Sequence, residues 1–260
     1  MSRSRPKRRR SAPPAAVLLA VLLLPVAAAG GGDALPAPLR PFEAVYRVVK
    51  GPLRLGTTTV DLQPRNAGWR YSSVTRADGL FALLVDGEAR ELATLELHDD
   101  GLRPRRYVHD EPDDADDVRM DFDWDAGRAR VVRDGRTHEV ATEAGMHDQF
   151  SVVLAMMRAV AGGAASASVP GIDDEGERVD FRFEVTGRET IEAPFGRYET
   201  LRVRRIRDDD RSTITWLAPA LGWLPVAIEQ RREGDLVARM ELESLDGRTG
   251  DAEARRPEGR

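Results

Sequence analysis

The sequence predicts a mainly β fold: a large curved antiparallel sheet, or a barrel-like fold, with one inserted helix. Apolar and polar residues alternate with a period of two through most of the chain, which is typical of strands with one buried face. Turn-forming residues, such as Asn-Ala-Gly at 66–68, separate these segments at short intervals. A single segment near residues 148–161 has the helical period instead. Because helices do not alternate with strands, a doubly wound α/β fold is excluded.

The first 29 residues have the layout of a secretory signal peptide. Six Arg and Lys residues lie within residues 3–10, and an apolar run from Ala15 to Ala29 follows. This run contains Pro25 and is short for a transmembrane helix, which needs about 20 apolar residues. We therefore expect residues 1–29 to be removed on export. The alternatives are an uncleaved N-terminal anchor and a nuclear-type basic patch beside an unrelated Ala/Leu stretch. The Gly- and Pro-rich residues 30–41 are expected to form a linker.

Charge and cysteine content narrow the class of protein further. Six of the 39 basic residues and none of the 44 acidic residues lie in residues 1–29, which leaves 33 basic against 44 acidic residues, net −11. Nucleic acids and anionic membrane surfaces favour basic proteins, so we expect neither as a partner.

The chain has no cysteine, which excludes disulfides, a thiolate metal site and a lipid-modified N-terminal cysteine. We expect a soluble periplasmic or extracellular protein that is not integral to the membrane after signal cleavage.

The strands of the first half are expected to begin at Phe42. The predicted segments are 42–49, 53–62, 69–75, 88–97, 102–108 and 118–124, followed by a meander that ends at Ala141. The apolar run Leu80–Val85 fits either a buried strand or one helical turn, because its periodicity does not distinguish them.

The helix is expected over residues 148–161, where apolar residues recur at helical spacing. Asp148 is a candidate N-cap, since its carboxylate can accept hydrogen bonds from the first backbone N–H groups. Further strands are predicted at 179–185, 198–206, 212–217, 223–229 and 236–245. A single antiparallel domain would therefore span residues 42–246, with the helix covering an open end or the concave face of the sheet. Residues 247–260 are charged and Gly-rich and are expected to be a disordered tail.

Three stretches of the sequence carry a resemblance to a known family. They are Pro41–Tyr46 with Gly56, Asp148–Ser151, and Glu192–Tyr198 followed by Trp216–Pro219 and Leu224–Val226. Their co-linear order resembles an exported bacterial family classed as a domain of unknown function, DUF3108. The resemblance implies a location in the cell envelope and an antiparallel β fold, and it supplies no activity, ligand or catalytic residue. More distantly, a curved sheet with a plugging helix is similar in shape to periplasmic carriers of lipoproteins and lipids.

No motif predicts catalysis, a metal site or a cofactor, and we expect none of these. His98, His109, His138 and His147 form no HxH, HExxH or HxxxH pair. A hydrolase using His147, Asp148 and Ser151 is the alternative, although no G-x-S-x-G elbow is present. The acidic loop 110–117 offers oxygen ligands for calcium but lacks the EF-hand order, so a solvated loop is the simpler interpretation.

Large apolar side chains are the remaining candidates for a ligand site. Inside a curved sheet they could line a cavity for an acyl chain or similar ligand, or they could form an ordinary core. The candidate lining residues are Trp69, Trp124, Phe150, Met157, Trp216 and Trp223. Our leading hypothesis is a non-enzymatic periplasmic protein that binds an apolar envelope component, a lipid or lipoprotein-like molecule, on a concave β face. The alternatives are an envelope structural or interaction protein without a small ligand, and a cell-wall or lipid hydrolase.

Overall fold

The computed structural model describes residues 39–65, 68–79, 82, 87–98, 101–112, 117–207 and 210–249. The expected signal peptide, nearly all of the linker, most of the Leu80–Val85 run, the centre of the acidic loop at 113–116 and the tail beyond residue 249 lie outside these ranges. The described residues belong to a single compact unit within Asp33–Arg260.

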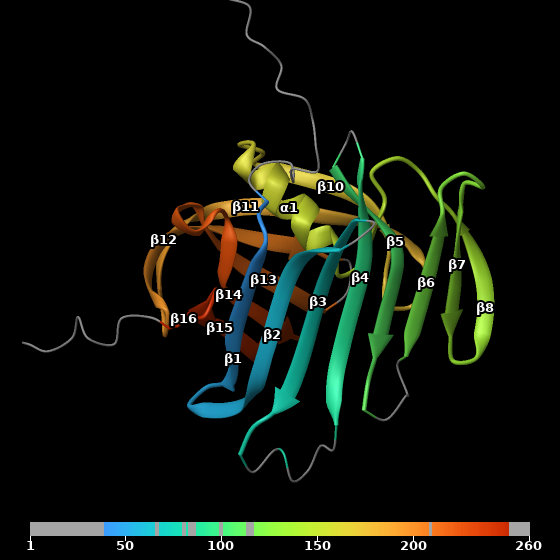
Figure 1. Cartoon of the computed structure of the whole chain (residues 1–260). Helices are drawn as coiled ribbons and strands as arrows, with labels where there is room; N and C mark the ends of the chain where they lie inside the picture. The colour runs from blue at the N-terminus through green and yellow to red at the C-terminus, as the bar shows by residue number, and fades with distance from the viewer. Residues whose placement is uncertain are drawn as a thin grey trace, which may run out of the picture. The chain divides into compact units, whose positions relative to one another are not determined.

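One sheet contains the sixteen strands of the described residues (Figure 1). The strands are β1 (Phe42–Lys50), β2 (Leu53–Arg65), β3 (Gly68–Ala77), β4 (Glu88–His98), β5 (Gly101–Asp110), β6 (Val118–Asp123), β7 (Arg128–Arg133), β8 (Arg136–Ala141), β9 (His147–Asp148), β10 (Ser166–Ile172), β11 (Arg178–Ala193), β12 (Gly196–Ile206), β13 (Arg211–Ala218), β14 (Leu224–Arg232), β15 (Asp235–Leu245) and β16 (Arg248–Thr249). The large antiparallel sheet with one α-helix confirms the predicted fold class.

The sheet runs as two meanders joined by the pairing of β1 with β15. Its order is β8-β7-β6-β5-β4-β3-β2-β1-β15-β14-β13-β12-β11-β10-β9, with β16 beside β15. Every pairing is antiparallel except that of β9 with β10. The sheet curves far enough to bring distant strands together. This is shown by a hydrogen bond from His138 Nε2 on β8 to the O of Gly176 (2.9 Å), which lies in the turn between β10 and β11.

Helix α1 (Val152–Ala161) packs against the inner face of this curved sheet, between β1–β4 and β10–β11 in Figure 1. It begins four residues later than the sequence pattern indicates and ends where predicted. Its buried side chains are Val152, Leu154, Met156, Met157 and Val160. Each such side chain contributes about 1.5–3 kcal/mol when fully buried, so packing, more than intrinsic helix propensity, holds this short helix in place.

Four strand segments were not expected from the sequence: the two-residue strands β9 and β16, strand β10, and the end of β11. Strand β16 lies at the start of the segment 247–260 that was expected to be a disordered tail, where it pairs with β15. Strand β10 is entirely additional, and β11 continues through Gly187 to Ala193 beyond the predicted end at 185. The segment after Gly187 is mostly exposed and polar, so it lacks the apolar alternation that marks a strand. Backbone pairing with β12 holds it, from Gly187 opposite Arg202 to Ala193 opposite Gly196.

Candidate ligand-binding cavity

A cavity of about 410 Å³ lies between the inner face of the sheet and helix α1. This volume is within the range of about 300–1,000 Å³ that is usual for small-molecule sites. Its apolar lining comes from Phe42, Tyr46, Val60, Tyr71, Phe150, Val152, Val153, Met156, Met157, Phe183, Leu224, Pro225, Ile228 and Met240. Its polar lining comes from Thr58, Ser73, Thr75, Glu91, His109, Gln149, Arg205, Thr213, Thr215 and Gln230.

The lining changes from apolar to polar along the strands. On β14 the inward residues run from buried Leu224 to Ile228 and then to exposed Gln230. On β3 they run from Tyr71 to Ser73 and Thr75. Because alternate residues of a strand share one face, these series follow the cavity wall away from α1. The cavity therefore has an apolar inner end beside the helix and a polar mouth.

Aromatic contacts form the wall at the apolar end. The rings of Tyr71 and Phe150 stack at 4.0 Å between centroids, and Phe42 meets Tyr71 edge-on at 6.5 Å. Tyr46 donates from its hydroxyl to the O of Pro225 (2.9 Å), which joins β1 to β14 across the cavity lining. Burial raises the pKa of Tyr46 above its usual range, so this hydroxyl keeps its proton.

A hydrogen-bonded row of polar residues runs along one side of the cavity, and three of its members, Glu91, His109 and Gln149, line it. Tyr107 donates from its hydroxyl to Glu91 Oε1 (2.8 Å) and accepts a hydrogen bond from Gln149 Nε2 (2.9 Å). The imidazole of His109 lies between two carboxylates, with Nδ1 3.6 Å from Glu91 and Nε2 2.9 Å from Glu111. The neighbouring carboxylate of Glu91 is the largest cause that raises the pKa of His109 to about 9. At neutral pH the imidazolium therefore compensates the negative charge on this wall.

The opposite side of the mouth carries Arg205. Its neighbours across the ladder are Phe183 on β11 and Thr213 on β13, and Thr213 is in turn opposite Gln230 on β14. All four line the cavity. The guanidinium packs over the ring of Phe181, 4.5 Å from its centroid. Burial is the largest cause that lowers the pKa of Arg205 to about 10, which leaves it cationic at neutral pH.

The residues before α1 form a buried polar cluster outside the cavity lining. Asp148 Oδ1 accepts hydrogen bonds from the backbone N–H of Phe150 (2.9 Å) and Ser151 (2.7 Å), and Oδ2 accepts one from Ser151 Oγ (2.7 Å). Asp148 thus orders the turn before the helix, but it is not the N-cap, which is Ser151. Burial raises the pKa of Asp148 to about 6.

This cluster does not have the arrangement of a hydrolytic triad. His147 Nδ1 lies 3.0 Å from Ser151 Oγ. The hydroxyl proton of Ser151 goes to Asp148, so the serine oxygen accepts from His147 instead of giving its proton to it. A nucleophilic serine needs the reverse direction and an exposed oxygen, whereas Ser151 and Asp148 are completely buried. The cluster therefore fixes the start of the helix.

Two of the six predicted lining residues line the cavity, namely Phe150 and Met157. Trp216 lies on the other face of the sheet, because its neighbour Thr215 points into the cavity. It is only 4% exposed, since Arg239 packs over its ring at 4.9 Å and its Nε1 donates to Glu189 Oε2 (2.8 Å).

The other three tryptophans also lie outside the cavity lining. Trp124 stacks with Phe122 at 5.7 Å and donates from Nε1 to the O of Pro104 (2.8 Å). Trp69 is half-buried on β3, and Trp223 lies at φ 67° between β14 and the 3-10 turn η2 (Pro219–Leu221). Their size indicates burial, but it does not indicate which face of the sheet they occupy.

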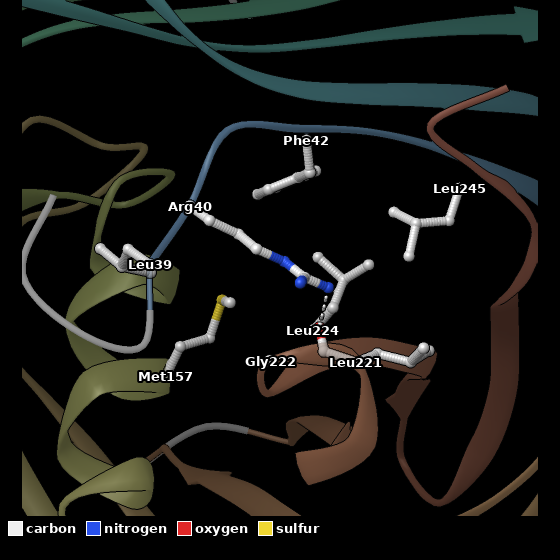
Figure 2. A pocket seen from close by; sticks show the side chains of 8 residues that line it. All are labelled: Leu39, Arg40, Phe42, Met157, Leu221, Gly222, Leu224 and Leu245. Carbon is white, nitrogen blue, oxygen red and sulfur yellow. Dashed lines mark hydrogen bonds between the residues drawn. The ribbon is translucent and has the colours of Figure 1, made fainter. Parts of the chain in front are cut away.

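A second, much smaller hollow adjoins the apolar end. It measures about 10 Å³ and shares Phe42, Met157 and Leu224 with the main cavity. Figure 2 shows Arg40 crossing it, with Nη2 3.5 Å from the O of Leu221, to which it donates. A space of this size holds at most about one water molecule. The segment before β1 therefore fills this end of the domain.

The part of the chain that the structure describes contains neither a metal-binding cluster nor a membrane-spanning helix. There, no group of three or more His, Cys, Asp or Glu side chains is placed to hold a metal ion. No helix in that part of the chain is both long and apolar enough to cross a bilayer, since α1 has only ten residues.

A known protein family matches the part of the chain that contains the cavity. The model for "Protein of unknown function (DUF3108)" matches residues 42–242. The chain belongs to the DUF3108 family. The match extends from β1 into β15, so every residue that lines the 410 Å³ cavity lies inside the DUF3108 domain. No curated protein matches the chain.

Two solved structures resemble the DUF3108 chain at low sequence identity. One is a β-barrel-like protein of domain of unknown function DUF1849 from Brucella abortus, with a TM-score of 0.48, 13% identity, and coverage of 79% of this chain and 97% of that one. The other is a protein with a YmcC-like fold from Bacteroides fragilis, with a TM-score of 0.31, 14% identity, and coverage of 82% and 99%.

Proposed function

We propose that this DUF3108 protein is an exported, non-enzymatic binding protein that holds the apolar part of a cell-envelope component in its cavity. The observation that carries this proposal is the graded lining, apolar beside α1 and polar at the mouth. An amphiphile gains free energy by burying its chain, at about 0.8 kcal/mol for each CH₂, while its polar end remains near water. Met156 and Met157 suit such a ligand, because methionine adapts to irregular apolar shapes.

The test is a titration with phenylnaphthylamine, a neutral apolar fluorophore that brightens when it leaves water. We expect one saturable site for each chain. In the Val153→Trp variant the indole would fill the cavity beside α1, and we expect binding to weaken at least about tenfold, as for loss of a buried apolar contact. Val237→Trp is the matched control, because Val237 is 44% exposed on β15 and does not line the cavity.

The outcome separates the binding protein from an interaction protein. Saturable binding that Val153→Trp weakens and Val237→Trp leaves intact supports the cavity as the site. Absence of saturable binding, or equal binding by the three proteins, contradicts the proposal and favours an envelope interaction protein without a small ligand.

The envelope location rests on residues 1–29 and has its own test. Leu22→Arg places a charge in the apolar run of the expected signal peptide. We expect this variant to remain in the cytoplasm with its N-terminus uncleaved, while the wild type is recovered from the periplasm without residues 1–29. Recovery of uncleaved wild-type protein from the cytoplasm would contradict export.

A further inference from the structure

We propose that the mouth of the cavity binds an anionic head group and that Arg205 is the residue that recognises it. The inference rests on the proposed function, because it assigns the chemistry of the ligand held in the same cavity. The ligand class would be a single-chain amphiphile that ends in a carboxylate or a phosphate.

The position of Arg205 is the first argument. It lies on the same cross-strand row as Thr213 and Gln230, both of which line the cavity. Gln230 is exposed and Thr213 is half-buried, so this row forms the cavity mouth. Arg205 therefore lines the cavity at the place where the polar end of a ligand would lie if its chain reached toward α1.

The lack of a protein partner for Arg205 is the second argument. Among the residues that the structure describes, its guanidinium makes a cation–π contact with Phe181 but no ion pair and no hydrogen bond. The nearby carboxylates are engaged elsewhere. Asp173 Oδ1 accepts from the backbone N–H of Glu175 and Glu177, and Asp174 Oδ2 lies 3.7 Å from Arg211. The stacked ring holds the side chain in place and leaves its N–H donors for a ligand.

The charge balance inside the cavity is the third argument. Its lining contains one carboxylate, Glu91, and two cations, His109 and Arg205. Glu91 already has the imidazolium of His109 at 3.6 Å and the hydroxyl of Tyr107 at 2.8 Å. Arg205 is therefore the cation of the lining that has no carboxylate partner within the lining, and an anion is the group that its planar set of donors binds best.

Competition for bound phenylnaphthylamine by three amphiphiles of equal chain length tests the inference. Dodecanoate and dodecyl phosphate carry an anion, and dodecanol does not. A charge-assisted hydrogen bond is worth about tenfold to a hundredfold in affinity, so we expect both anions to compete at least about tenfold better than dodecanol. Preference for only one of the two anions would identify the head group as carboxylate or phosphate, and it supports the inference in either case.

Two arginine variants isolate the residue. Arg205→Gln should lose the preference for the anions and retain dodecanol binding, which also shows that the variant is folded. Arg204→Gln is the matched control, because Arg204 is the preceding residue of β12 and lies on the outer face, where it pairs with Glu184 at 2.9 Å. It should behave like the wild type.

Each contrary result has a distinct meaning. Equal competition by dodecanol and the anions in the wild type, or a preference that Arg205→Gln retains, overturns the head-group assignment while the cavity remains a binding site. Absence of phenylnaphthylamine binding overturns the proposed function and this inference together.

Discussion

Tyr71 and Phe150 stack almost parallel, with ring centroids 4.0 Å apart and planes 11° apart. Tyr71 belongs to β3, and Phe150 precedes α1, so this contact joins the start of the helix to the inner face of the sheet. Both rings also line the cavity. The contact therefore supports both the stability of the fold and the shape of the proposed binding site.

Replacing Phe150 with alanine tests this role. We expect Phe150→Ala to lower the free energy of unfolding by about 3–5 kcal/mol, because it enlarges the cavity and removes a buried ring. Urea unfolding measures the change. Phe195→Ala is the control, since Phe195 is half-buried, stacks at 6.2 Å on Tyr198 and does not line the cavity. An equal or smaller loss in Phe150→Ala would show that the ring does not hold the helix.

Asp148 is expected to make stability depend on pH in a recognisable direction. Its pKa is about 6 in the folded protein, against 3.8 ordinarily, so the native state binds the proton more tightly than the unfolded state. Between pH 4 and pH 6 this group lowers the free energy of unfolding as pH rises, by up to about 3 kcal/mol. The measurement is urea unfolding of the wild type and of Asp148→Asn at several pH values. The free energy of unfolding of the wild type, relative to that of Asp148→Asn, should fall as pH rises from 4 to 6. Parallel curves would contradict the assignment.

His109 should be protonated at neutral pH. With a folded pKa of about 9, its contribution to stability is complete below about 6.5 and is lost as pH rises through about 9. An NMR titration of the imidazole Cε1–H signal, assigned by its loss in His109→Gln, measures the pKa. Glu91→Gln should lower this pKa, because the neighbouring Glu91 carboxylate is the largest cause of the shift. A titration midpoint of His109 below about pH 7 in the wild type would contradict the claim that its imidazolium compensates the charge of Glu91 on the cavity wall.

Gly171 should tolerate no side chain. An added Cβ would lie 2.1 Å from Cε2 of Phe181 and 2.6 Å from the backbone O of His147. Gly171→Ala must therefore displace β9 or the ring beneath Arg205, at a cost of about 1–3 kcal/mol in the free energy of unfolding. Ser168→Ala, at an exposed position of the same strand, is the control and should change little. Equal stability of the two variants would show that the contact relaxes freely.

Much of the fold could be predicted because strands with one buried face have apolar residues at every second position. The start of β1 at Phe42 and the alternation of Val118, Met120 and Phe122 on β6 are examples. The extension of β11 beyond Gly187 could not be predicted, because backbone pairing with β12 sustains a mostly exposed, polar segment.

The cavity lining was less predictable, because inward polar residues resemble surface residues. Thr213 and Arg205 have the composition of a solvated strand, and only the register across β12 and β13 places them on the inner face. Trp216 shows the opposite problem: it is large and buried, but arginine side chains cover it on the outer face. Residue size indicates burial, whereas the site depends on which face each residue occupies.

Native mass spectrometry tests the central claim most directly. The protein would be purified without detergent from the cells that make it and compared with a portion that has been denatured and extracted with solvent. We expect a reproducible additional mass on the native protein that disappears on extraction and is absent from Val153→Trp. A wild-type protein that carries no extra mass, or an extra mass that Val153→Trp retains, would contradict occupation of the cavity.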